Sequence, residues 1–152
     1  MRPVERGPWP QEDGHNVVFK EYGRARGYLI ARLGQYCSYC EQQLPASLAV
    51  EHVQPKSLVP DLEKDWNNFL LGCTNCNSTK GDEPVRLDDF VWPDKDNTFL
   101  CFEYSADGKV VPNSGLGDRE KKKAQDLIEL VGLDKRPPKK GTVAYHEASD
   151  RR

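Results

Sequence analysis

Four of the five cysteines fall into two pairs whose spacing suits metal binding. Cys37 and Cys40 form one CxxC pair, and Cys73 and Cys76 form a second. Zn²⁺ takes four tetrahedral ligands, and two thiolates separated by two residues can reach one ion from a single turn of chain. We therefore predict a structural zinc site with four thiolate ligands and no open position for chemistry. Cys101 lies outside the pairs and is interpreted as a buried apolar side chain.

The residues between and after these pairs must form ordered elements if all four thiolates are to meet. Residues 48–53 favour a strand that Pro55 ends, and residues 69–71 favour a second strand. Residues 74–80 suit a short helix that begins at the second cysteine pair. The predicted order is strand, long loop, strand and helix, held at both ends by the metal.

Further elements are expected on either side of this core. Apolar residues at helical spacing, Val18 among them, predict a helix over residues 15–33. After the core, residues 99–104 and 110–111 predict a β-hairpin. A last helix is expected to begin with Asp118 as its cap and to end at Gly132. One face of the first hairpin strand would consist of Leu100, Phe102 and Tyr104.

Length and composition are those of one small domain with limited apolar content. The chain has 152 residues, of which 37% are hydrophobic and 30% are charged. We predict one domain over residues 1–134 and a basic, flexible tail over residues 135–152. No apolar stretch approaches the roughly 20 residues of a membrane span, and the first residues lack the apolar region of a secretory signal. We therefore expect a cytoplasmic protein without membrane contacts, in which cysteines bind metal rather than form disulfides.

The formal net charge is only −2, but both ends of the chain are basic and its centre is acidic. Bound divalent cations would offset much of the central charge. Basic residues of the last helix and tail are a candidate track for a nucleic-acid backbone, with a plain solvated helix face as the alternative. This track consists of Arg119, Lys121, Lys122, Lys123, Lys135, Arg136, Lys139 and Lys140.

The segment over residues 37–82 resembles the HNH endonuclease family. In that family, a ββα-metal motif is set in a treble-clef-like zinc scaffold. The resemblance implies an α+β fold, a small zinc-stapled ββα-metal core with flanking N- and C-terminal helices and a β-hairpin. The flanks around residues 34–41, 102–108 and 123–133 resemble a narrower subgroup, some of whose members stand beside an ATPase in phage-defence systems such as Septu and certain retrons. The resemblance therefore implies a DNA endonuclease, in antiviral defence, with a partner ATPase.

The same resemblance assigns roles to single residues. His52 stands at the first His of the motif and would be the general base, and Asn68 at the Asn that braces the loop. Asn77 replaces the final His, and Glu51 stands at the acidic metal-ligand position, where Asp or His is more familiar. Lys80 follows Asn77 by three residues on one helical face and would meet a phosphate oxygen.

The chemistry of phosphodiester hydrolysis asks for the same residue types. It needs a base to activate water and a cation to neutralise charge on the phosphate and the leaving oxygen. His52 is the only histidine of the core, and Glu51 with Asn77 would give an oxygen site for Mg²⁺ or Mn²⁺. Neighbouring residues of a regular strand point to opposite faces, so the strand must end or twist at His52. Lys56 is interpreted as a solvated or phosphate-facing charge.

Two other functions fit the same residues. The chain could be a non-catalytic zinc module that binds nucleic acid or protein, with His52 as a structural residue. The cysteine pairs could instead be redox dithiols, which would leave the thiols accessible and no zinc bound. The sequence does not distinguish single- from double-stranded substrates, or DNA from RNA.

Overall fold

The computed structural model describes residues 1–106 and 108–135. Except for Lys135, the expected tail lies outside the described residues, and so do Arg136, Lys139 and Lys140 of the basic track.

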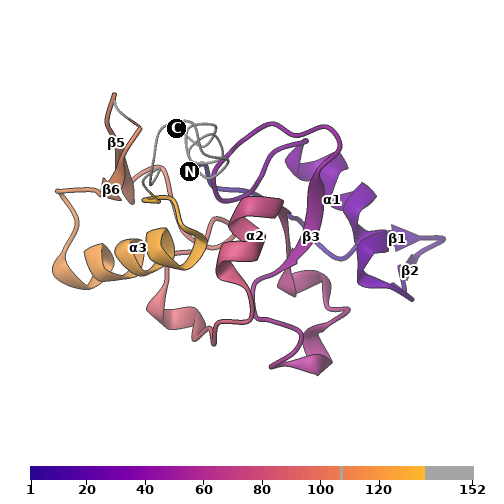
Figure 1. The fold of residues 1–152 in the computed structure, drawn as a ribbon. Helices are drawn as coiled ribbons and strands as arrows, with labels where there is room; N and C mark the ends of the chain where they lie inside the picture. Colours follow the sequence, from indigo (N-terminus) through magenta and orange to yellow (C-terminus); the bar gives the residue numbers. More distant parts are fainter. Residues whose placement is uncertain (107, 136–152) are drawn as a thin grey trace.

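The described residues form an α+β arrangement of short elements (Figure 1). The helices are α1 (Arg26–Leu33), α2 (Thr74–Lys80) and α3 (Asp118–Val131). Three antiparallel pairs of strands are β1 (Gln11–Glu12) with β2 (His15–Asn16), β3 (Leu48–His52) with β4 (Phe69–Cys73), and β5 (Phe102–Tyr104) with β6 (Val110–Pro112). Short 3₁₀ turns are η1 (Tyr22–Ala25), η2 (Pro60–Leu62), η3 (Trp66–Asn68) and η4 (Leu87–Asp89).

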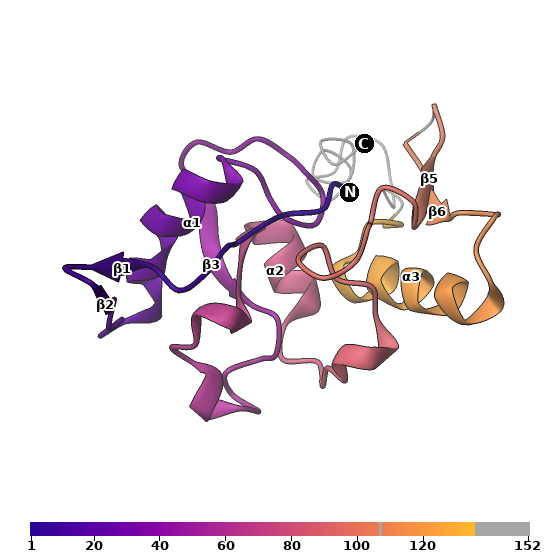
Figure 2. The ribbon, with the colours of Figure 1, turned by 180° about the vertical axis from the view of Figure 1, so that it is seen from behind.

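Helix α2 lies at the centre of the molecule, between the β3–β4 hairpin and α3 (Figure 1). The β1–β2 hairpin stands at one end, and β5, β6 and α3 stand at the other. Figure 2 shows the N-terminal arm crossing the rear of the molecule towards β1. Arg6 anchors this arm, because its guanidinium donates to the Phe69 carbonyl (2.6 Å) and to the buried Asp94 carboxylate (2.9 Å).

The core expected between the cysteine pairs is present as strand, loop, strand and helix. In the β3–β4 register, Leu48 lies opposite Cys73 and His52 lies opposite Phe69. The long loop therefore begins directly after His52 and returns directly before Phe69. Every residue of β4 is buried, and Trp66 packs against Phe19 with the ring centroids 6.1 Å apart. Burial of these apolar and aromatic side chains stabilises the platform that carries His52.

The helix predicted over residues 15–33 is wrong in its first half. That half contains β2 and an irregular segment, and helical structure begins only at η1 and α1. Val18, counted in the apolar face, is 85% exposed, whereas its neighbour Phe19 is buried. The apolar spacing was therefore coincidental at this end of the segment.

The predicted hairpin is confirmed, but its first strand is shorter than expected. β5 begins at Phe102, which is buried, whereas Leu100 and Tyr104 are 62% and 56% exposed. The predicted common face of these three residues is therefore wrong. A turn replaces the start of the strand, because the Leu100 amide donates to the Asn97 carbonyl at 3.0 Å.

Helix α3 confirms the last predicted helix and its end. Gly132 has a φ of 68°, a left-handed conformation that favours glycine, and the Leu133 amide donates to the Ile128 carbonyl as in a helix C-cap. Asp118 is not the cap that the sequence suggested, because Gly117 occupies that position and Asp118 is the first helical residue. The buried stripe consists of Ala124, Leu127, Ile128 and Val131.

Candidate active site and metal centre

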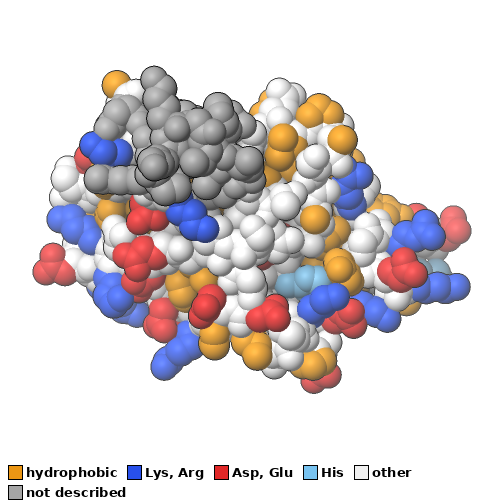
Figure 3. Space-filling view, in the orientation of Figure 1, with side chains coloured by type: hydrophobic (Ala, Val, Ile, Leu, Met, Phe, Trp, Pro, Cys, Tyr) orange, Lys and Arg blue, Asp and Glu red, His pale blue; other side chains and the backbone are white. Residues whose placement is uncertain are grey.

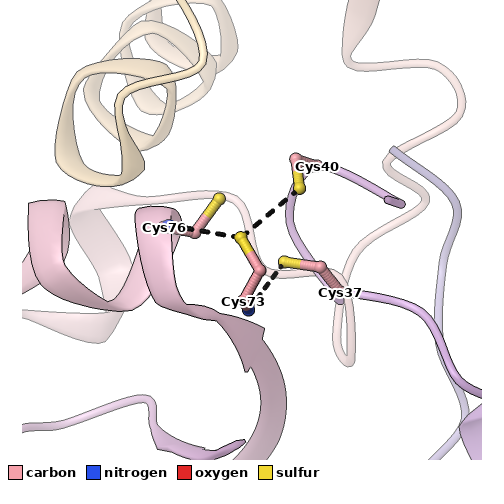
Figure 4. Close-up of side chains that lie close together, drawn as sticks. All are labelled: Cys37, Cys40, Cys73 and Cys76. Carbon is pink, nitrogen blue, oxygen red and sulfur yellow. Dashed lines mark hydrogen bonds between the residues drawn. The ribbon is translucent and has the colours of Figure 1, made fainter. Parts of the chain in front are cut away.

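The four paired cysteines meet at one place (Figure 4). Their sulfur atoms all lie within 4.8 Å of one another, and no disulfide joins the described cysteines. Cys37 and Cys40 come from the turn that follows α1, Cys73 ends β4, and Cys76 lies in the first turn of α2. The Cys73 amide donates to Cys37 Sγ and the Cys76 amide to Cys73 Sγ, both at 3.4 Å.

The electrostatics of this cluster fit a bound cation. Contacts with the neighbouring sulfurs, Cys37 first, raise the pKa of the Cys40 and Cys76 thiols far above the usual value. The same contacts lower the pKa of Cys73. Neighbouring thiolates repel one another, whereas a coordinated cation deprotonates its thiol ligands. The group could hold a metal ion with four sulfur ligands.

Cys101 is buried, outside the four-cysteine group, and its thiol donates to the Asn97 carbonyl at 3.4 Å. The interpretation of this residue as a buried apolar side chain is confirmed.

A second group of polar side chains lines a small cavity of about 130 Å³ where β3 ends against α2. Glu51 and His52 both line it, although they are neighbours on one strand. The conflict expected from strand geometry is thus resolved, because β3 ends at His52. The other lining side chains used below are Tyr22, Lys56, Asn77, Lys80 and Asp82.

His52 is held in one orientation by its Nε2 atom. This nitrogen lies 2.9 Å from the Glu63 carbonyl oxygen. A carbonyl oxygen only accepts hydrogen bonds, so Nε2 carries the hydrogen and Nδ1 keeps its lone pair. Burial lowers the pKa of His52, an effect that the bond to Glu63 partly opposes, and this favours the neutral imidazole. The rings of Tyr22 and Phe69 flank it edge-on, at centroid distances of 4.8 and 5.3 Å.

Glu51 is a buried carboxylate with spare bonding capacity. Lys80 Nζ lies 3.0 Å from its Oε1 atom, but this oxygen accepts no hydrogen bond from the described residues. Burial raises the pKa of Glu51, and the Lys80 charge opposes that shift. A Cβ atom at Gly72 would lie 3.1 Å from Glu51 Cβ and 3.6 Å from Asn77 Cβ. The absent side chain at Gly72 therefore leaves room for these two residues to face each other.

Asn68 ties the two ends of the long loop together. Its Oδ1 accepts from the Gln54 amide at 2.8 Å, and its Nδ2 donates to the Gln54 carbonyl at 2.9 Å and the Leu62 carbonyl at 3.3 Å. Leu62 precedes Glu63, whose carbonyl holds His52. Asn67, the neighbouring asparagine, is exposed.

The structure places Lys80 differently from the expected contact with a phosphate. Its side chain is only 1% exposed, and its Nζ donates to the His52 carbonyl at 2.7 Å besides facing Glu51. The helix packs this side chain inward against β3, so Lys80 has almost no surface to offer a substrate.

Two residues at or beside the cavity were missed in the sequence: Tyr22 lines it, and Gly72 lies next to Glu51 and Asn77. Tyr22 falls within the helix expected over residues 15–33 and was given no role in the site, and Gly72 attracted no interpretation. A glycine within a strand is a signal of a close approach by another group and could have indicated Gly72. Tyr22 is distant in sequence, and no local pattern links it to His52.

The basic track is only partly described. Within the described residues, Lys122 pairs with Asp126 at 2.8 Å, and Lys135 Nζ donates to Thr79 Oγ1 at 2.7 Å. A role of this face in binding nucleic acid stays a prediction. No helix among residues 1–106 and 108–135 has the length and apolar character needed to cross a membrane.

The segment that holds both groups has the features of a known class of nuclease. Residues 37–83 match the family model of the HNH endonucleases, which confirms the resemblance seen in the sequence. Two relatives are similar to this chain beyond the matched segment. The chain is 29% identical over 130 residues to the Septu protein PtuB of Bacillus thuringiensis. It is 27% identical over 113 residues to a retron Vc95 protein of Vibrio cholerae serotype O1 biovar El Tor, which is provisionally named an HNH endonuclease. These matches support a nuclease role.

The alignments cover 82% and 67% of this chain. They cover 47% of the Septu protein and 53% of the retron protein, so the chain spans about half the length of these relatives.

Proposed function

We propose that the chain is a metal-dependent HNH endonuclease that hydrolyses phosphodiester bonds in DNA. The observation that carries this proposal is the meeting of Glu51, His52 and Asn77 at one cavity, beside a separate group of four cysteines. An imidazole with a free lone pair and two oxygen donors is the minimum set for hydrolysis with one cation.

His52 is the general base of this proposal. With Nε2 donating to the Glu63 carbonyl, Nδ1 is the atom that can take a proton from water. The buried, neutral imidazole is ready for this step near pH 7. Asn68 is a positioning residue, because its bonds fix the loop whose Glu63 carbonyl holds the ring.

Glu51 and Asn77 would hold a catalytic Mg²⁺ or Mn²⁺. The fit rests on the two residues lining one cavity, on the buried Glu51 carboxylate, whose Oε1 lies 3.0 Å from Lys80 Nζ, and on the room that the absent side chain at Gly72 leaves beside Glu51 and Asn77. When bound there, a hard divalent cation would neutralise charge on the phosphate and the leaving oxygen. Lys80 shares the Glu51 carboxylate and orients it from the buried side.

The four cysteines would hold a structural Zn²⁺. All four sulfurs are needed to complete a tetrahedral set, so this ion would stabilise the fold and take no part in hydrolysis.

We also propose that the chain acts as the nuclease subunit of a phage-defence system. The support is the similarity to proteins named for Septu and for a retron. Its partners would be DNA and an ATPase subunit of the same system.

The test is cleavage of plasmid and single-stranded DNA with Mg²⁺, Mn²⁺ or a chelator. We expect metal-dependent cutting by the wild type and a loss of about 10²- to 10⁴-fold in His52→Ala, since general base catalysis contributes that much. His15→Ala is the matched control, because His15 is exposed on β2 and does not line the cavity. Equal cutting by the wild type and His52→Ala would refute the mechanism. Binding without any cutting would instead favour a non-catalytic zinc module.

A further inference from the structure

A phosphate that enters the cavity needs a positive charge that it can reach. Asp82 and Glu51 also line the cavity and would repel a phosphate. Lys56 and Lys80 are the two cationic side chains among the described residues that line it. The Lys80 side chain is 1% exposed and already contacts Glu51 and the His52 carbonyl. Of these two side chains, only that of Lys56 therefore has an accessible ammonium.

The present partner of Lys56 is easily exchanged. Its Nζ lies 3.6 Å from Glu63 Oε1, and both side chains are 42% exposed. Ion pairs that are this exposed contribute little, because water screens them. The ammonium can thus leave the Glu63 carboxylate for a backbone phosphate, whose two non-bridging oxygens share a negative charge and accept charge-assisted hydrogen bonds.

The position of Lys56 is nevertheless well defined. Lys56 follows Pro55, whose carbonyl accepts from the amides of Leu58 (3.0 Å) and Val59 (2.9 Å), so the backbone here is a closed turn. Its Nζ stands 4.2 Å from the centroid of the Tyr22 ring, a cation–π contact. The same ring packs edge-on against His52.

One aromatic ring therefore holds the proposed base and the accessible cation side by side. In Figure 3, a histidine side chain reaches the surface near β3, with Lys or Arg side chains next to it. A phosphate held by such a cation would lie next to the imidazole that activates the water.

We propose that Lys56 binds the phosphate of the nucleic-acid substrate at the mouth of the cavity, exchanging Glu63 for a phosphate oxygen, and that Tyr22 positions it. This inference rests on the proposed nuclease function and deepens it, because it assigns the phosphate contact to Lys56 rather than to Lys80.

The first experiment measures kcat/KM on plasmid DNA for the wild type, Lys56→Ala, Lys56→Arg and Lys64→Ala. Lys64 is the matched control, because it is an exposed lysine of the same loop that does not line the cavity. We expect a loss of about 10- to 100-fold in Lys56→Ala, the usual effect of one hydrogen bond to a charged group, with partial recovery in Lys56→Arg. Equal losses in Lys56→Ala and Lys64→Ala would overturn the proposal, since they would reflect only general charge.

The second experiment measures binding of a DNA duplex as a function of salt in His52→Ala protein, with and without Lys56→Ala. Loss of one phosphate contact should reduce the slope of log K against log salt by about one. An unchanged slope would overturn the phosphate contact. If Lys56→Ala reduces the slope but the wild type does not cut DNA, the phosphate contact stands and the nuclease function is refuted. The failure of this inference can therefore be told apart from the failure of the proposed function.

The role of Tyr22 is tested by Tyr22→Phe and Tyr22→Leu. Tyr22→Phe keeps the ring and should keep kcat/KM, whereas Tyr22→Leu should lower it. In the Lys56→Ala background, the further loss from Tyr22→Leu should be smaller, because part of the effect of the ring passes through Lys56. Additive losses would overturn the positioning role.

Discussion

At the scale of single residues, two lysines beside one cavity differ in what surrounds their charge. The Lys80 ammonium is removed from water and paired with a buried carboxylate, whereas that of Lys56 is half exposed and weakly paired. Because of this difference in burial, Lys80 compensates the charge of Glu51, whereas the Lys56 ammonium is accessible to a substrate. The sequence places Lys80 on the correct helix, but it does not reveal that this helix face packs against β3.

Removal of Lys80 should destabilise the fold. Lys80→Ala leaves the Glu51 carboxylate buried without its counter-charge, and breaking a buried pair in this way costs about 3–5 kcal/mol. Urea unfolding followed by circular dichroism measures the free energy of unfolding. The double variant Lys80→Met with Glu51→Gln should recover part of the loss, because it removes both charges.

Lys122→Ala is the matched control for this prediction. It breaks an ion pair of α3 in which the lysine side chain is 75% exposed, so its effect should be much smaller. Equal destabilisation by Lys80→Ala and Lys122→Ala would contradict the buried pairing.

At the scale of elements, the unit from β3 to α2 is the part that the sequence predicts best. Residues 74–80 form the expected helix, and both strands lie where the β-branched and apolar residues of the sequence predict them. Local signals suffice here because Pro55, the cysteine pairs and short apolar runs mark each boundary. Local sequence signals do not predict the path of the loop between the strands, because this path depends on the hydrogen bonds of Asn68 with Gln54 and Leu62.

Asn68→Ala should loosen this loop and slow the reaction. It removes bonds to Gln54 and Leu62 and leaves their backbone groups without these partners, at a cost of about 1–3 kcal/mol. Because the Glu63 carbonyl follows directly in the chain, His52 loses its fixed orientation. We expect kcat to fall more than KM rises, measured by steady-state cleavage at saturating metal.

Asn67→Ala serves as the control for the loop, since Asn67 is exposed on the neighbouring position. Asn68→Asp keeps an acceptor for the Gln54 amide, but its carboxylate cannot donate to the carbonyl oxygens of Gln54 and Leu62. This variant should therefore not restore kcat. Full activity in Asn68→Asp would argue against the bracing role.

At the scale of the whole molecule, the contacts that complete the site are distant in sequence. Tyr22 comes from η1, before the turn that carries Cys37 and Cys40, and its ring packs against His52. Arg6 in the N-terminal arm holds the carbonyl of Phe69, the residue opposite His52. A single sequence cannot indicate such pairs, because no spacing rule links them. The sequence therefore indicates candidate residues for the chemistry, but it does not indicate which distant residues contact them.

The four-cysteine group also links segments that are distant in sequence, and the fold should depend on the zinc that we propose for it. It joins the turn after α1 to β4 and α2, and binding of structural zinc is typically worth about 10–16 kcal/mol to small domains. Cys76→Ser should lose zinc and the cooperative thermal transition. Cys101→Ser, which alters a buried cysteine outside the group, should retain both. Elemental analysis and thermal circular dichroism of the two variants check this. Equal zinc content in both would contradict the assignment, and a metal-free wild type with a disulfide between Cys40 and Cys73, whose sulfurs lie 3.7 Å apart, would support redox dithiols instead.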